Sequence, residues 1–303
     1  MANIAKIFVI IVTYKGHQWY ERCFTSLRDS EYPIQTIVID NASNDGTVEY
    51  IREHFPEIHL IESEENLGFG RANNIGMRYA LNHGCDYVFL LNQDAWVESN
   101  TLSELVRIAE KNQEYGILSP IHLNAERTRI NVLIGLGNGY RNERFLSDLY
   151  LDSVQDLYET NYVNAAAWLL PRKILEIVGG FDPIFHHYEE DDNYLDRVIF
   201  HKFKIGICPS SRIIHDHVDS PLSDERLDYR QKQYLLVEWT NINKQFSLGG
   251  EFRYCLRKFL SHVFSRQFLQ AKRYYNRYLY CIKMKKAVCN SRIENKQKKS
   301  TWL

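Results

Sequence analysis

The chain has 303 residues, of which 45% are hydrophobic and 25% are charged, as is ordinary for a soluble globular protein. This length allows one large domain, or one domain with an appendage, and a sizeable core. No apolar segment approaches the roughly 18 residues that a membrane-spanning helix needs, which argues against an integral membrane protein.

The net charge of −1 hides a strong asymmetry along the chain. Residues 251–303 hold fourteen Lys and Arg against two acidic residues, which leaves 23 of the 37 basic and 36 of the 38 acidic residues in the preceding body. An acidic body with a basic tail suggests that the tail meets an anionic surface.

The six cysteines form no C-x-x-C pair and show no metal-type spacing, so a reducing cytoplasm is the simplest compartment. The N-terminal stretch MANIAKIFVIIVTYKG resembles a signal peptide only superficially. Its apolar run is short, and Tyr14-Lys15 stand where small cleavage-site residues belong. We therefore expect this run to be a buried first strand.

The first part of the chain alternates between strand and helix patterns. Apolar runs predict strands over 6–14, 34–43, 57–63 and 86–92. Helical spacing with capping residues and a terminal glycine predicts helices over 18–30, 44–55, 68–84 and 98–112. Strands and helices in this order predict a mainly parallel, doubly wound α/β sheet.

After residue 123 the pattern weakens. We expect irregular strands and loops over 124–162 that cover one side of a cleft, then a strand and short helix over 162–182, a helix over 188–203 and a further strand or strand pair over 204–217. From about residue 224 to the end the pattern is helical. This organisation predicts a domain over 1–223, with halves of about 1–120 and 121–223, and a helical basic extension over 224–303.

Three predicted strands end in polar residues, which are Thr13-Tyr14, Asp40-Asn41 and Asn92-Gln93-Asp94. The carboxyl ends of parallel strands lie along one edge of a sheet, where ligands bind in folds of this class. A single polar strand end is ordinarily a helix cap, but three on one edge favour a ligand site.

The glycine-rich segment NLGFGRANNIG lies between the second and third of these strand ends. Gly68 and Gly70 suggest the pattern G-x-G-x-x-G, but its third position is Asn73, so a dinucleotide fingerprint fails on spacing. No G-K-[ST] sequence is present, which excludes a Walker loop. A tight turn into a helix remains, whose free N–H groups can receive phosphate or ribose oxygens.

Six ordered motifs carry a resemblance to a known family: IVTYK, VIDNASNDGT, ENLGFGRANNIG, LLNQDA, GGFDPIFHHYEEDDNYLDR and IIHDHVDS. In order and approximate spacing the chain resembles the family-2 glycosyltransferases, most nearly their bacterial rhamnosyltransferase-like branch. The resemblance covers roughly residues 5–220 and implies a GT-A fold with a helical C-terminal extension. The six motifs are specific to the family and not to one sugar.

The resemblance implies a metal site at the fourth motif, which stands where the family carries its D-x-D motif. Asp94 is implied to bind a divalent cation, Mg²⁺ or Mn²⁺, on the nucleotide diphosphate, and Asn92 replaces the first carboxylate. His215, or else His217, is implied to contact the metal or the diphosphate. Val218 replaces the glycine of the family's H-x-x-G-x-S pattern. The alternatives are a helix cap for Asp94 and an ordinary loop histidine.

The same resemblance assigns the donor side of the site. Asp40 matches the aspartate that meets the nucleotide base or ribose, while Asp45 is equally explained as turn chemistry and Arg71 as a solvated helix residue. The expected nucleotide and donor residues are Thr13, Tyr14, Asp40, Asn41, Gly68, Arg71, Asn73 and Asn92.

The acidic cluster HHYEEDDNYLDR is implied to supply the general base. Glu190-Asp191 matches the family's glutamate–aspartate pair, with Asp191 as the base and Glu190 as its rival. Crowded carboxylates raise one another's pKa toward the range that a base needs. The usual Y-x-E-D-x-D pattern ends in Asn193 here, which puts a direct role for that position in doubt. For most of the cluster, a solvated helix start is the alternative.

The expected acceptor residues are Trp168, His187 and Tyr188. An aromatic face stacks well on a sugar ring, and a core tryptophan is the alternative for Trp168. His186 is expected to shape the same subsite.

The basic aromatic tail, over 254–286, mixes Phe, Tyr and Leu with Arg and Lys, as suits an amphipathic helix on an anionic membrane. A packing helix with a solvated basic face is the alternative, and nothing in the body supports a nucleic acid as partner. We expect a cytoplasmic protein that lies peripherally at the inner face of the cell membrane.

Together these features predict an inverting, metal-dependent glycosyltransferase. It would move a sugar from a nucleotide-diphosphate donor to a hydroxyl of a glycan or lipid-linked acceptor in bacterial surface polysaccharide synthesis. A catalytically silent nucleotide-binding scaffold is an alternative, since Asn92 and Asn193 replace carboxylates. A nucleotidyltransferase is a weaker one, because TYKGHQW supplies no basic glycine-rich loop.

Overall fold

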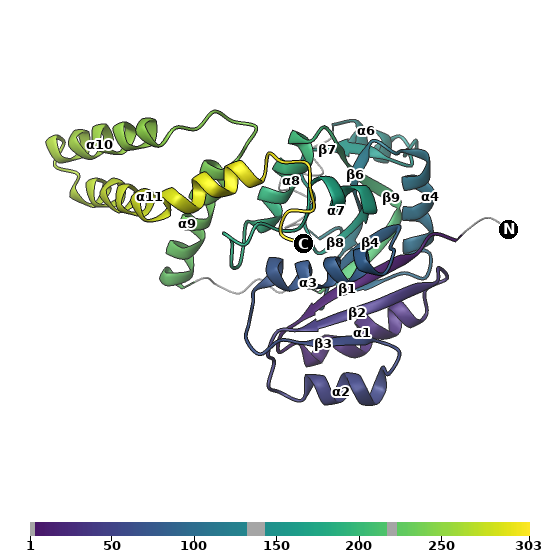
Figure 1. Cartoon of the computed structure of the whole chain (residues 1–303). Helices are drawn as coiled ribbons and strands as arrows, with labels where there is room; N and C mark the ends of the chain where they lie inside the picture. Colours follow the sequence, from purple (N-terminus) through teal and green to yellow (C-terminus); the bar gives the residue numbers. More distant parts are fainter. Residues whose placement is uncertain (1–3, 132–142, 217–222) are drawn as a thin grey trace.

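The computed structural model describes residues 4–131, 143–216 and 223–303 (Figure 1). Within them nine strands form one sheet in the order β3-β2-β1-β4-β8-β6-β9-β5, with β7 paired to β9. The strands are β1 Ile7–Thr13, β2 Ile34–Asp40, β3 His59–Glu62, β4 Tyr87–Asn92, β5 Ala95–Val97, β6 Tyr115–Leu123, β7 Tyr158–Thr160, β8 Ala167–Pro171 and β9 Lys204–His215. The helices are α1 His17–Arg28, α2 Thr47–His54, α3 Phe69–Asn82, α4 Thr101–Lys111, α6 Glu143–Tyr150, α7 Arg172–Ile177, α8 Glu190–Phe200, α9 Asp224–Thr240, α10 Leu248–Phe264 and α11 Phe268–Glu294.

The first half of the sheet is parallel, as predicted. β1 pairs in parallel with β2 and β4, and β2 pairs in parallel with β3. In this register Thr13 stands opposite Asp40, and Val12 stands opposite Asn92. The polar strand ends therefore lie along one edge of the sheet, where the strand pattern placed them.

The second half of the sheet is mixed. β8 runs antiparallel to β4 and β6, while β9 runs parallel to β6 and antiparallel to β5 and β7. The α/β class is confirmed, and β9 is one long strand. The short strand β5 was not predicted from the sequence, yet its pairing sets Ala95 opposite His215. This pairing brings the fourth motif against the sixth.

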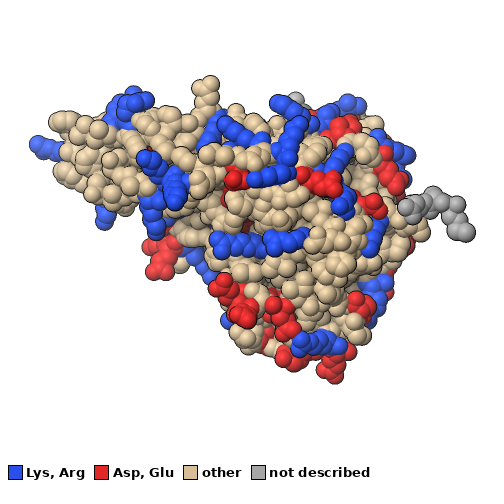
Figure 2. Space-filling view, in the orientation of Figure 1, with Lys and Arg blue, Asp and Glu red and all other residues tan. Residues whose placement is uncertain are grey.

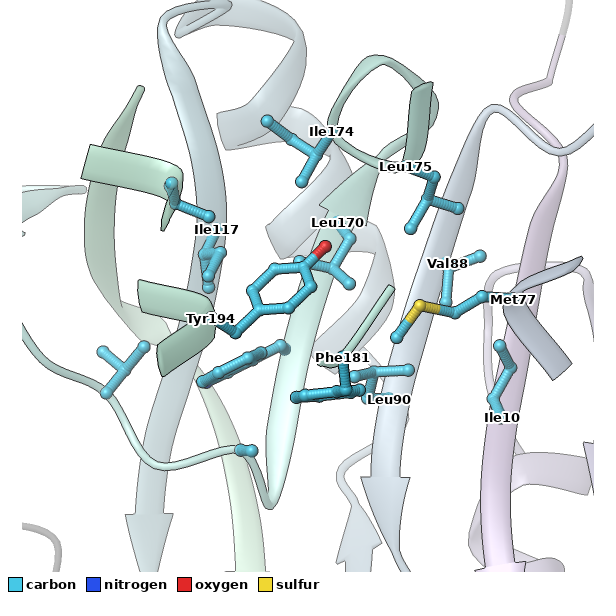
Figure 3. Close-up of a cluster of buried hydrophobic side chains, with 14 of the residues drawn as sticks. Ile10, Met77, Val88, Leu90, Ile117, Leu170, Ile174, Leu175, Phe181 and Tyr194 are labelled. Carbon is cyan, nitrogen blue, oxygen red and sulfur yellow. The ribbon is translucent and has the colours of Figure 1, made fainter. Parts of the chain in front are cut away.

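Alternate residues of the buried strands face two helical layers. Ile7, Val9 and Ile11 of β1 pack in a cluster with α1, α2 and α4. Ile10 faces the other way, into a cluster with α3, α7 and α8 that includes Met77 (Figure 3). Because both faces are covered, the strands read as continuous apolar runs.

The C-terminal extension consists of α9 and a hairpin of α10 and α11. Figure 1 shows the hairpin extending beyond the sheet, with its turn at the far left. Phe185 packs with Trp239 of α9 and Cys281 of α11, so the extension contacts the body through its own apolar cluster. The division of the chain at residue 223 stays a prediction.

A short segment, Gly179–Asp182, is the point at which three parts of the chain meet. Asn74 of α3 donates to the carbonyl oxygen of Phe181 at 2.8 Å and accepts from its N–H at 2.7 Å. The buried Arg197 of α8 donates to the Gly180 carbonyl oxygen at 2.7 Å. Asp182 accepts from Ser291 at 2.6 Å and from Asn295 at 2.8 Å, near the chain end.

The Asn74 contact predicts a large loss of stability on truncation. Asn74→Ala leaves a buried N–H and a buried carbonyl oxygen without their partner, at a cost of about 2–4 kcal/mol in the free energy of unfolding. Urea unfolding measures it. Asn82→Ala, at an exposed position of the same helix, is the matched control and should change stability by less than about 0.5 kcal/mol. Equal stability of the two variants would contradict the role given to Asn74.

Candidate active site

The carboxylate of Asp40 is held at the end of β2 by three groups. Thr13 Oγ1 donates to Asp40 Oδ1 at 3.0 Å, the Ser43 N–H donates to Oδ2 at 3.0 Å, and the Ser43 hydroxyl also donates to Oδ1. Thr13 and Asp40 are both buried. The structure thus brings together two predicted residues and adds Ser43, which the sequence reasoning did not single out.

Asn41 ties the glycine-rich turn to the sheet. Its side chain accepts from the Leu67 N–H at 2.9 Å and donates to the Gly68 carbonyl oxygen at 3.3 Å. Gly68 has φ +78°, and a Cβ there would lie 1.9 Å from the carbonyl oxygen of His186. Only glycine permits this approach. The turn before α3 and the chain leading to the acidic cluster are therefore in direct contact.

Two predicted donor residues of α3 bond to protein groups. Arg71 donates to the Pro183 carbonyl oxygen at 3.0 Å, and the buried Asn73 donates to the Phe69 carbonyl oxygen at 3.0 Å. Their role toward a nucleotide stays a prediction.

The end of β4 is fastened to the end of β1 by Gln93. Its side chain accepts from the Tyr14 N–H at 2.8 Å and donates to the Tyr14 carbonyl oxygen at 3.1 Å. A side chain at Gly16 would collide with Gln93 at 2.5 Å, so the packing is close. Asn92 is half-buried at the strand end beside this contact. Gln93, the middle residue of the motif, therefore holds the two strand ends together. Asn92 and Asp94, on either side of it, lie at the edge of the sheet.

Asp94 directly precedes β5, and His215 is the last residue of β9. The pairing of these two strands brings the two side chains together. Asp94 Oδ1 lies 3.3 Å from His215 Nε2, and the Asp216 N–H donates to the Asp94 carbonyl oxygen at 2.9 Å. Asp216 in turn accepts from the indole N–H of Trp19 at 3.0 Å. His217, the alternative metal residue, lies outside the described residues.

A second histidine, His122 of β6, lies next to His215. Their rings are 5.9 Å apart and nearly perpendicular, and His122 Nε2 is 3.2 Å from the Ser119 hydroxyl. Burial, together with the nearby His215, holds the pKa of His122 well below its usual value, so the ring is neutral. The sequence offered no signal for this residue beyond its place in a buried strand.

Asp94 and His215 fit part of a divalent cation site. Neighbouring ligands of an octahedral cation lie about 3 Å apart, because each metal–oxygen bond is about 2.1 Å long. The Asp94–His215 separation of 3.3 Å is close to this. Among the described residues no group of three or more His, Cys, Asp or Glu side chains could hold a metal ion. A cation here would take its remaining ligands from diphosphate oxygens and water, as Mg²⁺ commonly does.

The acidic cluster begins with two residues whose backbone conformation is rare for bulky side chains. Tyr188 and Glu189 have φ +67° and +68°, in the left-handed region, immediately before α8. Such conformations cost of order 1–3 kcal/mol each and concentrate at functional sites. They turn the chain so that Glu190, Asp191 and Asp192 occupy the first turn of α8.

The carboxyl groups of this cluster have strongly raised pKa values. Burial, and then the charge of Asp191, raise the pKa of Glu190 to about 8. Burial, and then the charge of Asp192, raise the pKa of Asp191 to about 7. Glu190 is 6% exposed, and its Oε2 has no hydrogen-bond partner among the described residues. The solvated-helix-start alternative therefore does not describe Glu190. Asp191 is the more accessible of the two.

The cluster lies beside the donor side of the site. A side chain at Gly70 would meet Phe181 at 2.9 Å and Glu190 at 3.7 Å, so the first turn of α3 faces the first turn of α8. Asn193 is buried and donates to Thr240 of α9 at 3.2 Å. The residue that departs from the family pattern therefore packs against the extension.

The three predicted acceptor residues lie in different surroundings. Trp168 is fully buried, with its ring 6.1 Å from Phe181 and 5.7 Å from Tyr194, so it matches the core alternative and presents no face to a sugar. His187 is exposed, and its ring lies 4.0 Å from that of Tyr188. The Arg230 guanidinium of α9 lies 5.1 Å from the Tyr188 ring. α9 therefore forms one wall beside this pair.

The fold is shared with solved GT-A glycosyltransferases. The mannosyltransferase PcManGT from Pyrobaculum calidifontis, solved in complex with GDP-Man and Mn²⁺, is similar with a TM-score of 0.57 and 18% identity. The likeness covers 81% of this chain and 66% of that chain.

The chain belongs to glycosyl transferase family 2, whose model matches residues 8–176, more than half of its length. A hexosyltransferase of low-salt glycan biosynthesis, Agl10 of Haloferax volcanii, is 24% identical over 229 residues, or 75% of this chain and 71% of that protein. An N-acetylglucosaminyl-diphospho-decaprenol L-rhamnosyltransferase of Mycobacterium tuberculosis is 24% identical over 242 residues, or 70% of this chain and 76% of that protein. The protein is therefore a glycosyltransferase.

The buried cluster predicts an unusual pH dependence of stability. The folded pKa of Glu190, about 8, exceeds the ordinary glutamate value of 4.5. The folded state therefore keeps a proton that the unfolded chain releases, and stability falls as the pH rises between these two values. Urea unfolding from about pH 5 to about pH 8 should show a decrease on the order of 1–3 kcal/mol.

The Glu190→Gln variant should flatten part of this decrease, because its amide does not titrate while Asp191 still does. Glu225→Gln, at an exposed position of α9, is the control and should keep the wild-type slope. An unchanged slope in Glu190→Gln would show that Glu190 does not hold the proton.

Proposed function

We propose that this glycosyltransferase is an inverting enzyme that transfers a sugar from a nucleotide-diphosphate donor to a hydroxyl of a glycan or lipid-linked acceptor. The observation that carries the proposal is Asp191, whose raised pKa of about 7 lies in the range that a general base needs. In support, Asp191 follows Glu190, which faces the start of α3, and Asp40 and Asp94 lie at the carboxyl edge of the sheet.

The donor is proposed to lie along the carboxyl edge of β1, β2 and β4. Asp40, oriented by Thr13 and Ser43, would meet the base or ribose, and the start of α3 would face the donor. Asp94 and His215 would hold a divalent cation, Mg²⁺ or Mn²⁺, on the diphosphate. When bound, such a cation neutralises the negative charge of the leaving diphosphate.

Asp191 is proposed to remove the proton from the acceptor hydroxyl. The oxygen of that hydroxyl attacks the anomeric carbon opposite the diphosphate, the bond to the diphosphate oxygen breaks, and the proton remains on Asp191. This single displacement inverts the anomeric centre and needs no covalent nucleophile. Glu190, buried and with a pKa near 8, is mainly protonated at neutral pH and is the poorer base.

The acceptor is proposed to be presented at a membrane surface. The mycobacterial relative is named for a lipid-linked acceptor, and the basic extension of this chain suits an anionic bilayer. Among the described residues no helix is both long and apolar enough to span a membrane. The proposal therefore places the enzyme peripherally at the inner membrane face, in surface polysaccharide synthesis.

Replacement of the base should abolish transfer and spare donor binding. Asp191→Asn is expected to lower kcat by roughly 10²–10⁴-fold, because an amide cannot accept the proton. Wild-type kcat/KM should rise as the pH increases through about 7. Asp196→Asn, on the same helix, is the control and should stay within a few-fold of wild type. Sugar transfer by Asp191→Asn at the wild-type rate would exclude Asp191 as the base.

The scaffold alternative gives a different result in the same assay. If the protein is a scaffold, a nucleotide should bind to the wild type, but no sugar should be transferred to any of a range of glycan acceptors.

Loss of Asp94 should remove the metal-dependent part of nucleotide binding. A nucleotide at a hundred times its Kd stabilises the fold by roughly 2.7 kcal/mol, which thermal unfolding detects as a shift of several degrees. With UDP, dTDP, GDP or CDP, the wild-type shift should grow when Mn²⁺ is added. This increment should vanish in Asp94→Ala and persist in Asp29→Ala, an exposed control. An undiminished increment in Asp94→Ala would exclude it as a metal ligand.

A further inference from the structure

The turn between α10 and α11 carries large apolar side chains in the open. Phe264 is 83% exposed, Leu269 is 80% exposed, and Phe268 between them is 67% exposed. All three sit at the end of the hairpin that extends farthest from the sheet (Figure 1). Exposed phenylalanine and leucine gathered in one place mark an interaction surface.

Two stripes of exposed apolar residues run from this turn along the hairpin. On α10, Leu256 and Leu260 precede Phe264 at intervals of four residues. On α11, Leu279 and Ile282 continue from Phe268 at helical spacing. Other aromatic residues form the contact between the helices, as with the Phe252 and Tyr278 rings, which lie 5.3 Å apart. Each helix therefore carries exposed apolar residues beside its contact with the other helix.

The hairpin's own charged residues around these stripes have a single sign. Residues 252–293 contain eleven Lys and Arg and no Asp or Glu. The acidic residue just before this range, Glu251, is largely buried and pairs with Arg277 at 2.5 Å. In Figure 2 the outer part of the hairpin shows Lys and Arg and no acidic residue. A partner for this surface must be both apolar and anionic.

The three residues that join α10 to α11 have paired backbone donors. The N–H groups of Ser265, Arg266 and Gln267 all donate to carbonyl oxygens of the last turn of α10, at 2.8–3.0 Å. Entry into a bilayer is costly for unpaired backbone donors. In this turn those three donors are already satisfied.

We propose that the α10–α11 turn inserts Phe264, Phe268 and Leu269 into the interface of an anionic bilayer, while the flanking lysines and arginines contact lipid phosphates. The inference identifies the membrane-binding element and rests on the membrane location within the proposed function. A second copy of the chain is a poorer partner, because it would bring two hairpins of like charge together.

The hairpin is firmly connected to the site that it would position. Near its C-terminal end α11 bonds to Asp182 through Ser291, and Arg292 donates to the Trp239 carbonyl oxygen of α9 at 3.0 Å. Asp182 lies in the segment that leads to α8 and Asp191. Membrane binding at the turn would therefore fix the orientation of the site relative to the bilayer.

Vesicle flotation of the full chain tests the proposal. Vesicles contain equal parts of phosphatidylglycerol and phosphatidylcholine, with pure phosphatidylcholine as the neutral arm. The tip variant is Phe264→Ser with Leu269→Ser. The matched control is Tyr150→Ser with Leu151→Ser, two residues of the body that are 88% and 67% exposed. Thermal unfolding and transfer to a soluble acceptor are measured on all three proteins.

We expect wild type and control to float with anionic vesicles at low salt and to bind neutral vesicles far more weakly. The tip variant should bind roughly tenfold less or weaker, because two apolar side chains no longer leave water. Its unfolding temperature and its transfer to a soluble acceptor should equal those of wild type.

Two results would overturn the inference. One is undiminished flotation of the tip variant. The other is a wild-type dimer in sedimentation that becomes monomeric in the tip variant, since the turn would then be a contact between copies. Absence of sugar transfer by wild type would instead count against the proposed function, and the flotation result would stand independently of it.

Discussion

The position of the candidate base, Asp191, depends on the segment Gly179–Asp182. Gly179 has φ +84°, and a Cβ there would lie 2.1 Å from the Thr301 carbonyl oxygen, so the chain end packs directly on its backbone. Asn74 and Arg197 bond to the backbone of the same segment from two helices. Because α8 begins only a few residues later, these contacts set where Asp191 stands relative to the start of α3.

That rigidity holds an acidic cluster that is unfavourable by itself. Carboxyl groups crowded at a buried helix start repel one another when ionised, and the left-handed backbone at Tyr188 and Glu189 adds strain. Desolvation is the largest cause of the raised pKa values of Glu190 and Asp191. A looser scaffold would relax and let water in, and the pKa of Asp191 would fall. The hydrogen bonds to Gly179–Asp182 would therefore serve the proposed chemistry as well as the fold.

The sequence pattern predicted those features of the fold that depend on residues close together in the chain. Apolar strands that end in polar residues predicted that Thr13 and Asp40 lie along one edge of the sheet, because the carboxyl ends of parallel strands meet there. The pairing of Asp94 with His215 across a three-residue strand, and the bonds of Asn74 to a segment 107 residues away, are tertiary and have no local signal. Trp168 is the clearest case in which the sequence did not predict the surroundings of a residue. The family resemblance implies that it faces the acceptor, yet the packing of Phe181 and Tyr194 buries it.

The apolar stripes also bear on how the hairpin would meet a bilayer. From Phe268 to Ser291, α11 spans roughly 35 Å at 1.5 Å per residue. A hairpin standing upright on its turn would hold Asp182, and with it Asp191, about that far from the lipid. Leu260 and Leu279, exposed along its length, favour a hairpin that lies along the surface. In that orientation the proposed acceptor side would lie nearer to the headgroups than in an upright one, as a lipid-linked acceptor would require.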